Sequence, residues 1–322
     1  MGTAQPPVLA LDIGGTKLAV AVVTPDGGTH GLVIEPTHRE DGPEAVLGRL
    51  FAMGHRALAR AGLDEPVAAV GISCGGPLDA ASGVLLCPPH LPGWIDVPVG
   101  ARASAAFGLP FALENDATAA ALAEHRYGAG RGTSTMLYLT VSTGVGGGAV
   151  VDERLHRGAA GNGGEFGHVM VHLGGRLCTC GRRGCVEAYA AGSAIAARAV
   201  EALADGRASS LRTLPAPTAA DVARAARAGD PLAAELWDQA TDALGSAVTD
   251  LVNVFEPDLV VLGGGVTRAG AQLLDPVRAA VASSAMGPAA RAARIELTQL
   301  GDVVCVVGAG AVALDLREAA RA

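Results

Sequence analysis

A compact cluster of potential metal ligands, between residues 161 and 187, constrains this chain more than any other stretch. Cys178, Cys180 and Cys185 fall within eight residues, and His168 lies ten positions before the first of them. Thiolate and imidazole are the ligands that a tetrahedral Zn²⁺ prefers, and three cysteines with one histidine form a closed structural set. Cys178 and Cys180 are too close in sequence for an easy disulfide. The sequence therefore predicts a zinc site, and a set of buried free thiols is the alternative.

The fourth ligand of this site stays open, because two histidines are candidates. A short strand is expected between the glycine-rich start of the stretch and the cysteines, and on a strand His168 and His172 would point to the same face. Glu165 and Glu187 lie just outside the two ends of the cluster, and a bound metal would also fix these acids in space. Two fixed acceptors suit a ligand rich in hydroxyls. The alternative is that both are solvated surface glutamates.

An early hairpin carries the first of three glycine clusters. Two apolar runs flank Gly14 and Gly15, which is a hairpin signal. The backbone N–H groups of such a turn and the hydroxyl of Thr16 can hold phosphate oxygens, and Lys17 adds positive charge nearby. Asp12, just before the turn, could hold a Mg²⁺–phosphate unit through water. The alternative is an ordinary hairpin, and the pattern is not that of a Walker A loop.

A second hairpin, over residues 135–151, repeats this plan of strand, glycine turn with threonine, and strand. Its turn contains Thr143 and Gly144. The third glycine cluster, residues 263–265, follows a buried strand, and a packing turn is its alternative role. Two similar turns indicate a duplicated pair of lobes that close on a nucleotide. A loose dinucleotide fingerprint at 308–313 is rejected, since too few residues follow it for a βαβ unit, and close packing of the last helix is expected there.

A short strand over residues 111–113 ends in Glu114, Asn115 and Asp116, and an alanine-rich helix follows. At a strand end beside a helix N-terminus, the amide of Asn115 can hold one hydroxyl. The carboxylate of Asp116 can accept the proton of another. The alternative is that Asp116 merely caps the helix.

At these residues the chain resembles the ROK family of bacterial sugar kinases and repressors, and within it most of all the ATP-dependent glucokinases. The family's Glu-x-Gly-His pattern matches residues 165–168, and its Cys-x-Cys-Gly-x-x-Gly-Cys-x-Glu pattern matches residues 178–187. Its catalytic signature Glu-Asn-Asp-Ala matches residues 114–117. The resemblance covers nearly the whole chain.

The resemblance implies roles for these residues. Asp116 would be the general base, and Glu165, His168 and Glu187 would contact sugar hydroxyls together with Gly76, Asn115 and Asp116. The zinc would be structural, held by His168, Cys178, Cys180 and Cys185, with one ring nitrogen of His168 on the metal and the other on the sugar. Mg²⁺ would arrive with ATP. The implied nucleotide-binding residues are Asp12, Gly14, Gly15, Thr16, Lys17, Thr143, Gly144, Gly264 and Gly265.

The fold that the resemblance implies is α/β, a two-lobed actin-like ATPase fold of the hexokinase and Hsp70 type, with nucleotide and sugar in a cleft between the lobes. The N-terminal α/β lobe would span residues 1–115, and a last helix at about 308–322 would return to it. A larger C-terminal α/β lobe would span residues 116–307 and carry the zinc-binding loop. Two departures from the family stand out. Gly75 replaces the usual proline, and His90 replaces a frequent asparagine, so we assign His90 no role at this stage.

The implied activity is ATP-dependent phosphorylation of a hexose at its 6-hydroxyl, with glucose as the first candidate and glucose 6-phosphate as the product. The alternatives are a kinase for N-acetylmannosamine, mannose or fructose, a polyphosphate donor, or a sugar-sensing regulator. Regulators of the family carry a winged helix-turn-helix before the kinase-like region, whereas the first hairpin here begins by Val8. A homo-oligomer, dimer or tetramer, is also implied.

Composition disfavours two other classes of protein. A formal net charge of −8 and 3% aromatic residues give neither the basic surface nor the stacking platforms of a nucleic-acid binder. No apolar run approaches the roughly 20 residues of a membrane span, and residues 1–7 lack the features of a signal peptide. Cys74, Cys87 and Cys305 remain as scattered single thiols, which fits a reducing cytoplasm.

Overall fold

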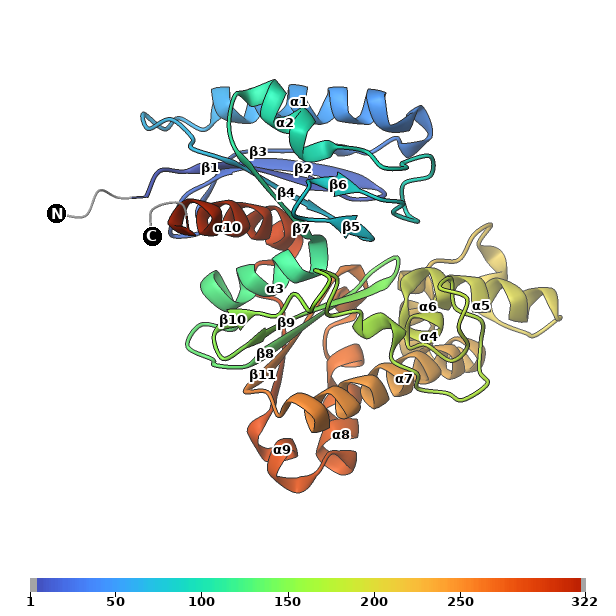
Figure 1. Ribbon diagram of the computed structural model, residues 1–322. Coiled ribbons are helices and arrows are strands. Elements are labelled where there is room, and N and C mark those ends of the chain that lie inside the picture. The colour runs from blue at the N-terminus through green and yellow to red at the C-terminus, as the bar shows by residue number, and fades with distance from the viewer. Residues whose placement is uncertain (1–4, 320–322) are drawn as a thin grey trace. The chain divides into compact units, whose positions relative to one another are not determined.

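The computed structural model describes residues 5–319, which divide into two compact units, each built around its own five-stranded sheet (Figure 1). Within the described residues, unit 1 comprises 5–131, 155–164 and 300–319, and unit 2 comprises 132–154 and 165–299. The first four residues of the chain, and the last three of the helix expected at 308–322, lie outside the described residues.

The sheet of unit 1 has the strand order β3-β2-β1-β4-β7. β1 pairs antiparallel with β2 and parallel with β4, and β4 pairs parallel with β7. The early hairpin is therefore confirmed, and parallel strands extend the sheet beyond it. The strands are β1 (Val8–Ile13), β2 (Lys17–Val23), β3 (Thr29–Pro36), β4 (Val70–Cys74) and β7 (Phe111–Asn115).

Helices cover both faces of this sheet, which explains why β1 and β2 read as unbroken apolar runs. Leu9 and Leu11 point to the face that α1 and α2 cover. Val8 and Ala10 point to the opposite face and pack against α10. The helices of this unit are α1 (Gly42–Arg60), α2 (Val99–Phe107), α3 (Asp116–Tyr127) and α10 (Val304–Ala319), and a small hairpin pairs β5 (Leu78–Asp79) with β6 (Val84–Leu85).

Unit 1 continues past the boundary expected at residue 115, because α3 packs closely against α10. Gly308 permits the contact, since a Cβ added there would lie 2.3 Å from the carbonyl oxygen of Ala119. Gly310 faces β2 in the same way, with Val23 2.6 Å from its added Cβ. The close packing predicted for the glycines of this last helix is confirmed.

Unit 2 repeats the plan of an antiparallel hairpin beside parallel strands, in the order β10-β9-β8-β11-β12. Its strands are β8 (Met136–Val141), β9 (Val145–Val151), β10 (Arg154–Leu155), β11 (Leu259–Gly263) and β12 (Arg294–Leu297). Its helices are α4 (Glu187–Ala190), α5 (Gly192–Ala204), α6 (Ala219–Arg227), α7 (Pro231–Phe255), α8 (Ala271–Ser284) and α9 (Gly287–Ala292).

The helical part of unit 2 begins where the sequence places its caps. Thr218 and Asp221 form a capping box at the start of α6. Asp230 caps α7, and its side chain accepts a hydrogen bond from the backbone N–H of Ala233 at 3.0 Å. Trp237 and Leu244 on α7 are buried in the large core that fills this unit.

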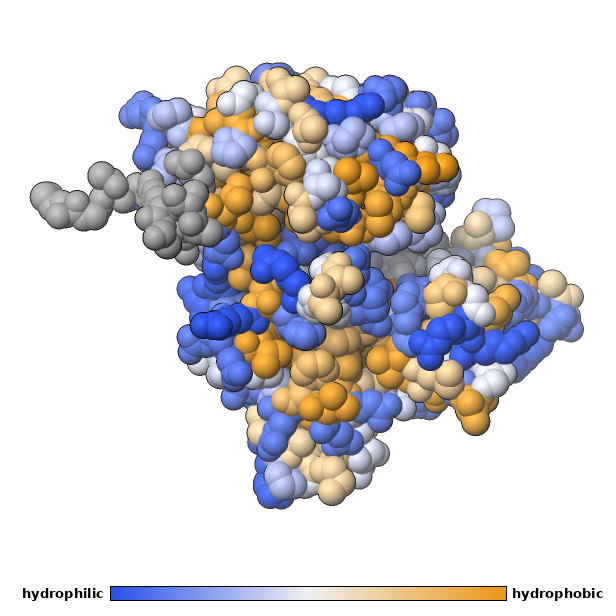
Figure 2. Space-filling view, viewed as in Figure 1, coloured by the Kyte–Doolittle hydropathy of each residue, from blue (hydrophilic) through white to orange (hydrophobic). Residues whose placement is uncertain are grey.

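The surface of the protein is mixed in polarity. On the face shown in Figure 2, hydrophilic residues separate the hydrophobic ones into patches. Among the described residues, no helix combines the length and the apolar character needed to cross a membrane.

The contact between α3 and α10 gives a stability prediction. Gly308→Ala should destabilise the protein by about 1–3 kcal/mol, because overpacking forces two backbones apart. Gly48→Ala is the matched control, since Gly48 lies in α1 and an added Cβ there meets nothing within 4 Å. That change should stabilise by about 0.5–1 kcal/mol through helix propensity. Urea unfolding of both variants measures the difference, and equal effects would contradict the packing argument.

Candidate active site and metal centre

The carboxyl ends of three parallel strands meet at one edge of the sheet in unit 1. Ile13 at the end of β1 is the register partner of Cys74 at the end of β4, and Cys74 is the partner of Asn115 at the end of β7. The glycine turn after β1, the loop after β4 and Asp116 after β7 therefore emerge side by side. In open α/β sheets, ligands bind at this edge.

Two hydrogen bonds, one within the turn and one from Thr37, fix the conformation of the first glycine turn. The N–H of Gly14 donates to the carbonyl oxygen of Lys17 at 3.0 Å, and the hydroxyl of Thr37 donates to the carbonyl oxygen of Gly14 at 2.6 Å. Thr16, at the tip, is exposed. Lys17 extends its ammonium to the carbonyl oxygen of Asp302 at 3.0 Å. Hydrogen bonds thus fix the turn at Gly14, while Thr16 at its tip remains exposed.

Asp12, beside this turn, is a buried carboxylate with a polar neighbour. Its side chain accepts a hydrogen bond from the hydroxyl of Ser73 at 2.8 Å. Burial raises the pKa of Asp12 to about 7, although the Ser73 hydrogen bond and the charge of Lys17 act in the opposite direction. A carboxylate that burial penalises in this way gains from a nearby cation, so the residue fits a role beside Mg²⁺.

Asn115 caps α3, a role that the sequence analysis considered only for Asp116. Asn115, not Asp116, is the N-cap of α3, and its side-chain oxygen accepts from the N–H groups of Ala117 at 3.0 Å and Thr118 at 3.2 Å. The NH₂ group of Asn115 points toward Gly76, because it lies 3.6 Å from where a Cβ of Gly76 would be. Its amide therefore keeps a donor for a ligand while its oxygen holds the helix.

Asp116 stands at the start of α3 with a carboxyl in an unusual environment. One of its oxygens accepts the N–H of Ala117 at 2.8 Å. Burial raises the pKa of Asp116, and the charge of His90 is the largest influence that lowers it. A carboxyl with a raised pKa is a better proton acceptor once it is ionised, which is what general-base chemistry needs.

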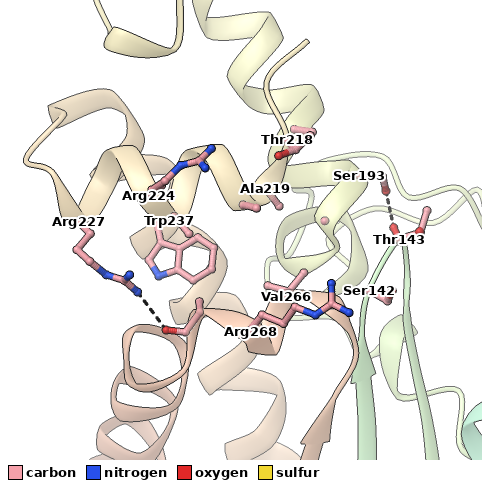
Figure 3. A pocket seen from close by; sticks show the side chains of 16 residues that line it. Ser142, Thr143, Ser193, Thr218, Ala219, Arg224, Arg227, Trp237, Val266 and Arg268 are labelled. Atoms are coloured by element: carbon pink, nitrogen blue, oxygen red, sulfur yellow. Dashed lines mark hydrogen bonds between the residues drawn. The ribbon is translucent and has the colours of Figure 1, made fainter. Parts of the chain in front are cut away.

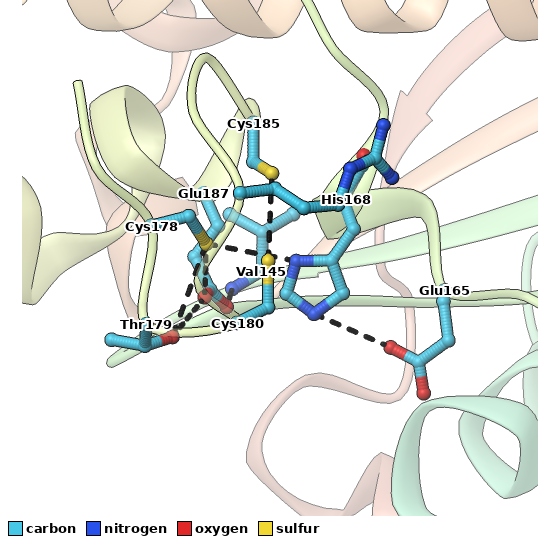
Figure 4. Close-up of polar contacts among 9 residues, drawn as sticks. Val145, Glu165, His168, Cys178, Thr179, Cys180, Cys185 and Glu187 are labelled. Atoms are coloured by element: carbon cyan, nitrogen blue, oxygen red, sulfur yellow. Dashed lines mark hydrogen bonds and ion pairs between the residues drawn. The ribbon is translucent and has the colours of Figure 1, made fainter. Parts of the chain in front are cut away.

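The metal-ligand cluster predicted from the sequence comes together in unit 2. One ligand atom from each of His168, Cys178, Cys180 and Cys185 lies within 4.8 Å of all the others. Figure 4 shows the three sulfur atoms and the imidazole ring turned toward one another. The Cys180 and Cys185 sulfurs are 3.7 Å apart, and the Cys178 sulfur is 3.7 Å from Nδ1 of His168.

These spacings fit a tetrahedral metal. With a Zn–S length of about 2.3 Å, two sulfurs of a tetrahedral site lie about 3.8 Å apart. Burial raises the pKa of Cys178 to about 12 and also raises that of Cys185. A divalent cation would take the place of these protons, because thiolates are the binding form. The donor set and its geometry therefore fit Zn²⁺.

The structure distinguishes between the two candidate histidines. His168 directs Nδ1 at the cluster, whereas the ring of His172 packs edge-on against Tyr189 with 6.1 Å between ring centroids. The prediction of a strand between His168 and the cysteines is wrong. His168 ends a short 3₁₀ helix, η2 (Phe166–His168), and the chain beyond it makes only isolated bridges, such as that between Met170 and Cys185.

Two glutamates flank the cluster. Nε2 of His168, the nitrogen turned away from the sulfurs, lies 3.7 Å from a carboxylate oxygen of Glu165 (Figure 4). Glu187 accepts hydrogen bonds from the hydroxyl of Thr179 at 3.0 Å and from the backbone N–H of Val145 at 3.0 Å. Glu187 is therefore not a solvated surface residue. It connects the cysteine loop to the tip of the β8–β9 hairpin.

A pocket of about 500 Å³ opens beside that hairpin within unit 2 (Figure 3). Of the predicted nucleotide-binding residues, Thr143 and Gly265 line it. Gly144 and Gly264 do not line the pocket. A Cβ added to Gly144 would lie 2.8 Å from a carboxylate oxygen of Glu187, and a Cβ added to Gly264 would lie 2.5 Å from the carbonyl oxygen of Val141. Gly144 therefore allows the Glu187 carboxylate to approach the backbone, and Gly264 allows close backbone packing next to the pocket.

Sequence reasoning missed most of the walls of this pocket. Trp237 and three arginines line it, and Ser193 donates its hydroxyl to the carbonyl oxygen of Thr143 at 2.6 Å. These residues come from four separate helices, and only the tertiary fold brings them together. The arginines are Arg224, Arg227 and Arg268.

Several known proteins are similar to this chain over most of its length. The ROK family model matches residues 8–316. A glucokinase of Thermotoga maritima is 36% identical over 275 residues, which covers 84% of this chain and 86% of that protein. An N-acetylmannosamine kinase of Yersinia pestis is 37% identical over 261 residues, or 80% and 82% of the two chains. The structure of a ROK family glucokinase from Streptomyces griseus in complex with glucose and AMPPNP is 33% identical, has a TM-score of 0.81, and matches 96% of this chain and 99% of that chain.

The two histidines offer a matched test of the metal site. Purified, untagged protein should contain about one zinc per chain, a stoichiometry expected for a closed four-ligand site. His168→Asn should lower the zinc content and the melting temperature, whereas His172→Asn should leave both close to wild type. Elemental analysis and thermal unfolding measure the outcome. Equal zinc loss in the two variants, or no zinc in the wild type, would contradict the assignment.

Proposed function

The chain belongs to the ROK family, and on that premise we propose that it is an ATP-dependent hexose kinase that converts glucose to glucose 6-phosphate. The observation that carries the proposal is the placement of Asp116. A carboxyl with a raised pKa follows β7, at the same sheet edge as the glycine turn after β1. Phosphoryl transfer needs these two parts, a base for the attacking hydroxyl and a holder for the phosphates.

In the proposed reaction, the Asp116 carboxylate takes the proton of the sugar's 6-hydroxyl. The freed oxygen forms a bond to the γ-phosphorus of ATP, and the bond from that phosphorus to the β–γ bridging oxygen breaks. ADP leaves with the electron pair of that bond, and Asp116 returns its proton to solvent. Mg²⁺ bound to the ATP phosphates supplies charge neutralisation, and Asp12 is the residue that would face it through water.

We propose that the sugar is oriented by the remaining predicted residues. The free NH₂ of Asn115, beside Gly76, can donate to one hydroxyl. Glu165 and Glu187 can accept from others, and Nε2 of His168 is turned away from the sulfur cluster as a sugar contact requires. Zinc would be held by the four cluster residues and would supply no chemistry. It would fix the loop that carries these contacts.

The nucleoside end of ATP is proposed to enter the 500 Å³ pocket of unit 2. Its size is in the range of small-molecule sites, and Trp237 with several alanines gives an apolar interior. Arg224, at the pocket, pairs with Asp221, and Arg227 donates to the carbonyl oxygen of Ala269 and to the side chain of Gln272, so both side chains are held in place around the apolar interior. This arrangement supports a nucleotide as donor over a bare polyphosphate chain, which would not use an apolar pocket.

A second candidate activity is phosphorylation of N-acetylmannosamine. It is favoured by the 37% identity to the N-acetylmannosamine kinase of Yersinia pestis. The two sugars differ at position 2, both in the substituent and in its configuration. Homo-oligomer formation also stays a proposal.

The assignment of Asp116 predicts a specific kinetic loss. Asp116→Asn should lower kcat by about 10²–10⁴-fold, the usual contribution of a positioned general base, while glucose still binds. Asp238→Asn, an exposed change on α7, is the control and should keep the wild-type rate. Coupled ADP release and calorimetric glucose titration measure the two quantities. Near-normal turnover by Asp116→Asn would remove it from the mechanism.

The choice of sugar predicts a pattern across substrates. Glucose should give the highest kcat/KM among glucose, mannose, fructose and N-acetylmannosamine, with ATP as donor, in an ADP-release assay. Polyphosphate should not replace ATP in a parallel assay of glucose 6-phosphate. A preference for N-acetylmannosamine would favour the second candidate, and no turnover of any hexose would refute the kinase proposal itself.

A further inference from the structure

The side chain of Asn162, in the 155–164 segment of unit 1, has a fixed orientation. Its NH₂ group donates to the carbonyl oxygen of Ala160 at 3.0 Å and to that of Leu78 at 3.4 Å. Carbonyl oxygens can only accept, so these two bonds determine which end of the amide carries the oxygen. That oxygen, Oδ1, accepts no hydrogen bond from any residue that the structure describes. The side chain is half-buried, so Oδ1 is available to a ligand.

Oδ1 of Asn162 and the NH₂ group of Asn115 border the same space beside Gly76. A Cβ built on Gly76 would lie 3.7 Å from Oδ1 of Asn162 and 3.6 Å from Nδ2 of Asn115. The oxygen of Asn115 accepts from two backbone N–H groups at the start of α3, so the orientation of this second amide is fixed as well. Because Gly76 has no side chain, an acceptor and a donor face a space that the protein leaves free.

An ion pair holds the segment of Asn162 against the strand that carries Asn115. Nε of Arg157 donates to one carboxylate oxygen of Glu114 at 2.7 Å, and the Glu114 side chain is only 1% exposed. The other carboxylate oxygen of Glu114 accepts the backbone N–H of Asn115 at 3.1 Å. The N–H of Gly163 donates to the carbonyl oxygen of Arg157 at 2.8 Å, which closes the segment. The two amides are thus held in place by bonds within unit 1.

A donor beside an acceptor favours a hydroxyl group over an ion as the ligand. A hydroxyl oxygen can accept from Nδ2 of Asn115 while its hydrogen is donated to Oδ1 of Asn162. Two hydroxyls on neighbouring carbons of a sugar ring satisfy the same pair of groups. A phosphate oxygen only accepts, so it would meet a second acceptor at Asn162, and a metal cation would meet the N–H groups of Asn115.

We propose that Asn162 is a specificity-determining residue of the sugar site. Its Oδ1 accepts a hydrogen bond from a ring hydroxyl of the hexose, at or next to the hydroxyl to which Asn115 donates. This inference rests on the proposed function, because it concerns the same sugar and deepens the account of how that sugar is recognised. It adds a residue from the 155–164 segment, which held none of the residues named from the sequence.

Glucose analogues that each lack one ring hydroxyl test this contact. Asn162→Ala should lower kcat/KM for glucose by about 3–10-fold, the usual effect of losing one hydrogen bond between uncharged groups. The four analogues lack the hydroxyl at position 1, 2, 3 or 4. For at least one of them, Asn162→Ala should match the wild type, because the hydroxyl that Oδ1 contacts is already gone. ADP release gives kcat/KM, and competition against glucose gives the affinity of an analogue that reacts slowly.

Two further variants support the interpretation of this experiment. Asn162→Leu keeps most of the volume of the side chain without its polar atoms, and it should give the same pattern as Asn162→Ala. It also serves in place of Asn162→Ala if that variant does not fold. Asn253→Ala is the matched control, because Asn253 is an exposed asparagine on α7 in unit 2, and it should keep the wild-type values for glucose and all four analogues.

Two results would overturn the inference. An equal loss on glucose and on every analogue would show that Asn162 acts only through the fold of its segment, since no single hydroxyl would then depend on it. An unchanged kcat/KM for glucose in both Asn162 variants would show that Oδ1 makes no contact with the sugar.

The failures of the two proposals can be told apart. A wild type that phosphorylates no hexose overturns the proposed function and this inference together. An active wild type with either of the two contrary results overturns the inference alone and leaves the assignment of Asp116 untouched.

Discussion

The pairing of three parallel strands is the constraint on which the chemistry of unit 1 depends. Because β1, β4 and β7 end in register, the glycine turn after β1, the glycine loop after β4 and the carboxylate of Asp116 are brought to one edge of the sheet. A slip of one residue in the pairing of β1 would send Asp12 to the other face of the sheet, and a slip of β7 would displace Asp116, which directly follows that strand. The site is thus specified by backbone hydrogen bonds before any side chain takes part.

Local sequence patterns predicted the elements that carry this site. The two hairpins are confirmed, since each depends on residues close together in the chain. The cysteine cluster was also predictable, because four ligands within a short stretch leave few ways to fold round an ion. These motifs and their order carry the resemblance to the family, and that resemblance implied the two-lobed α/β fold.

Features that depend on tertiary contacts were not predictable in this way. Spacing alone did not distinguish His168 from His172, because the strand assumed between them does not form; the family resemblance implied His168, which the structure places in the cluster. The capping role of Asn115 depends on the backbone angles at the start of α3. The pocket around Trp237 is assembled from helices far apart in the chain, and no spacing rule relates them.

Glu187 gives the cysteine loop a mechanical connection to the hairpin of unit 2. One carboxylate oxygen accepts from Thr179 in the loop and the other from the N–H of Val145 at the hairpin tip. Order in one segment therefore favours order in the other, which is a thermodynamic linkage. If a bound ion orders the cysteine loop, part of the free energy of binding that ion also stabilises the β8–β9 hairpin. Loss of the ion would then loosen the hairpin, although the ion is held by the loop and by His168.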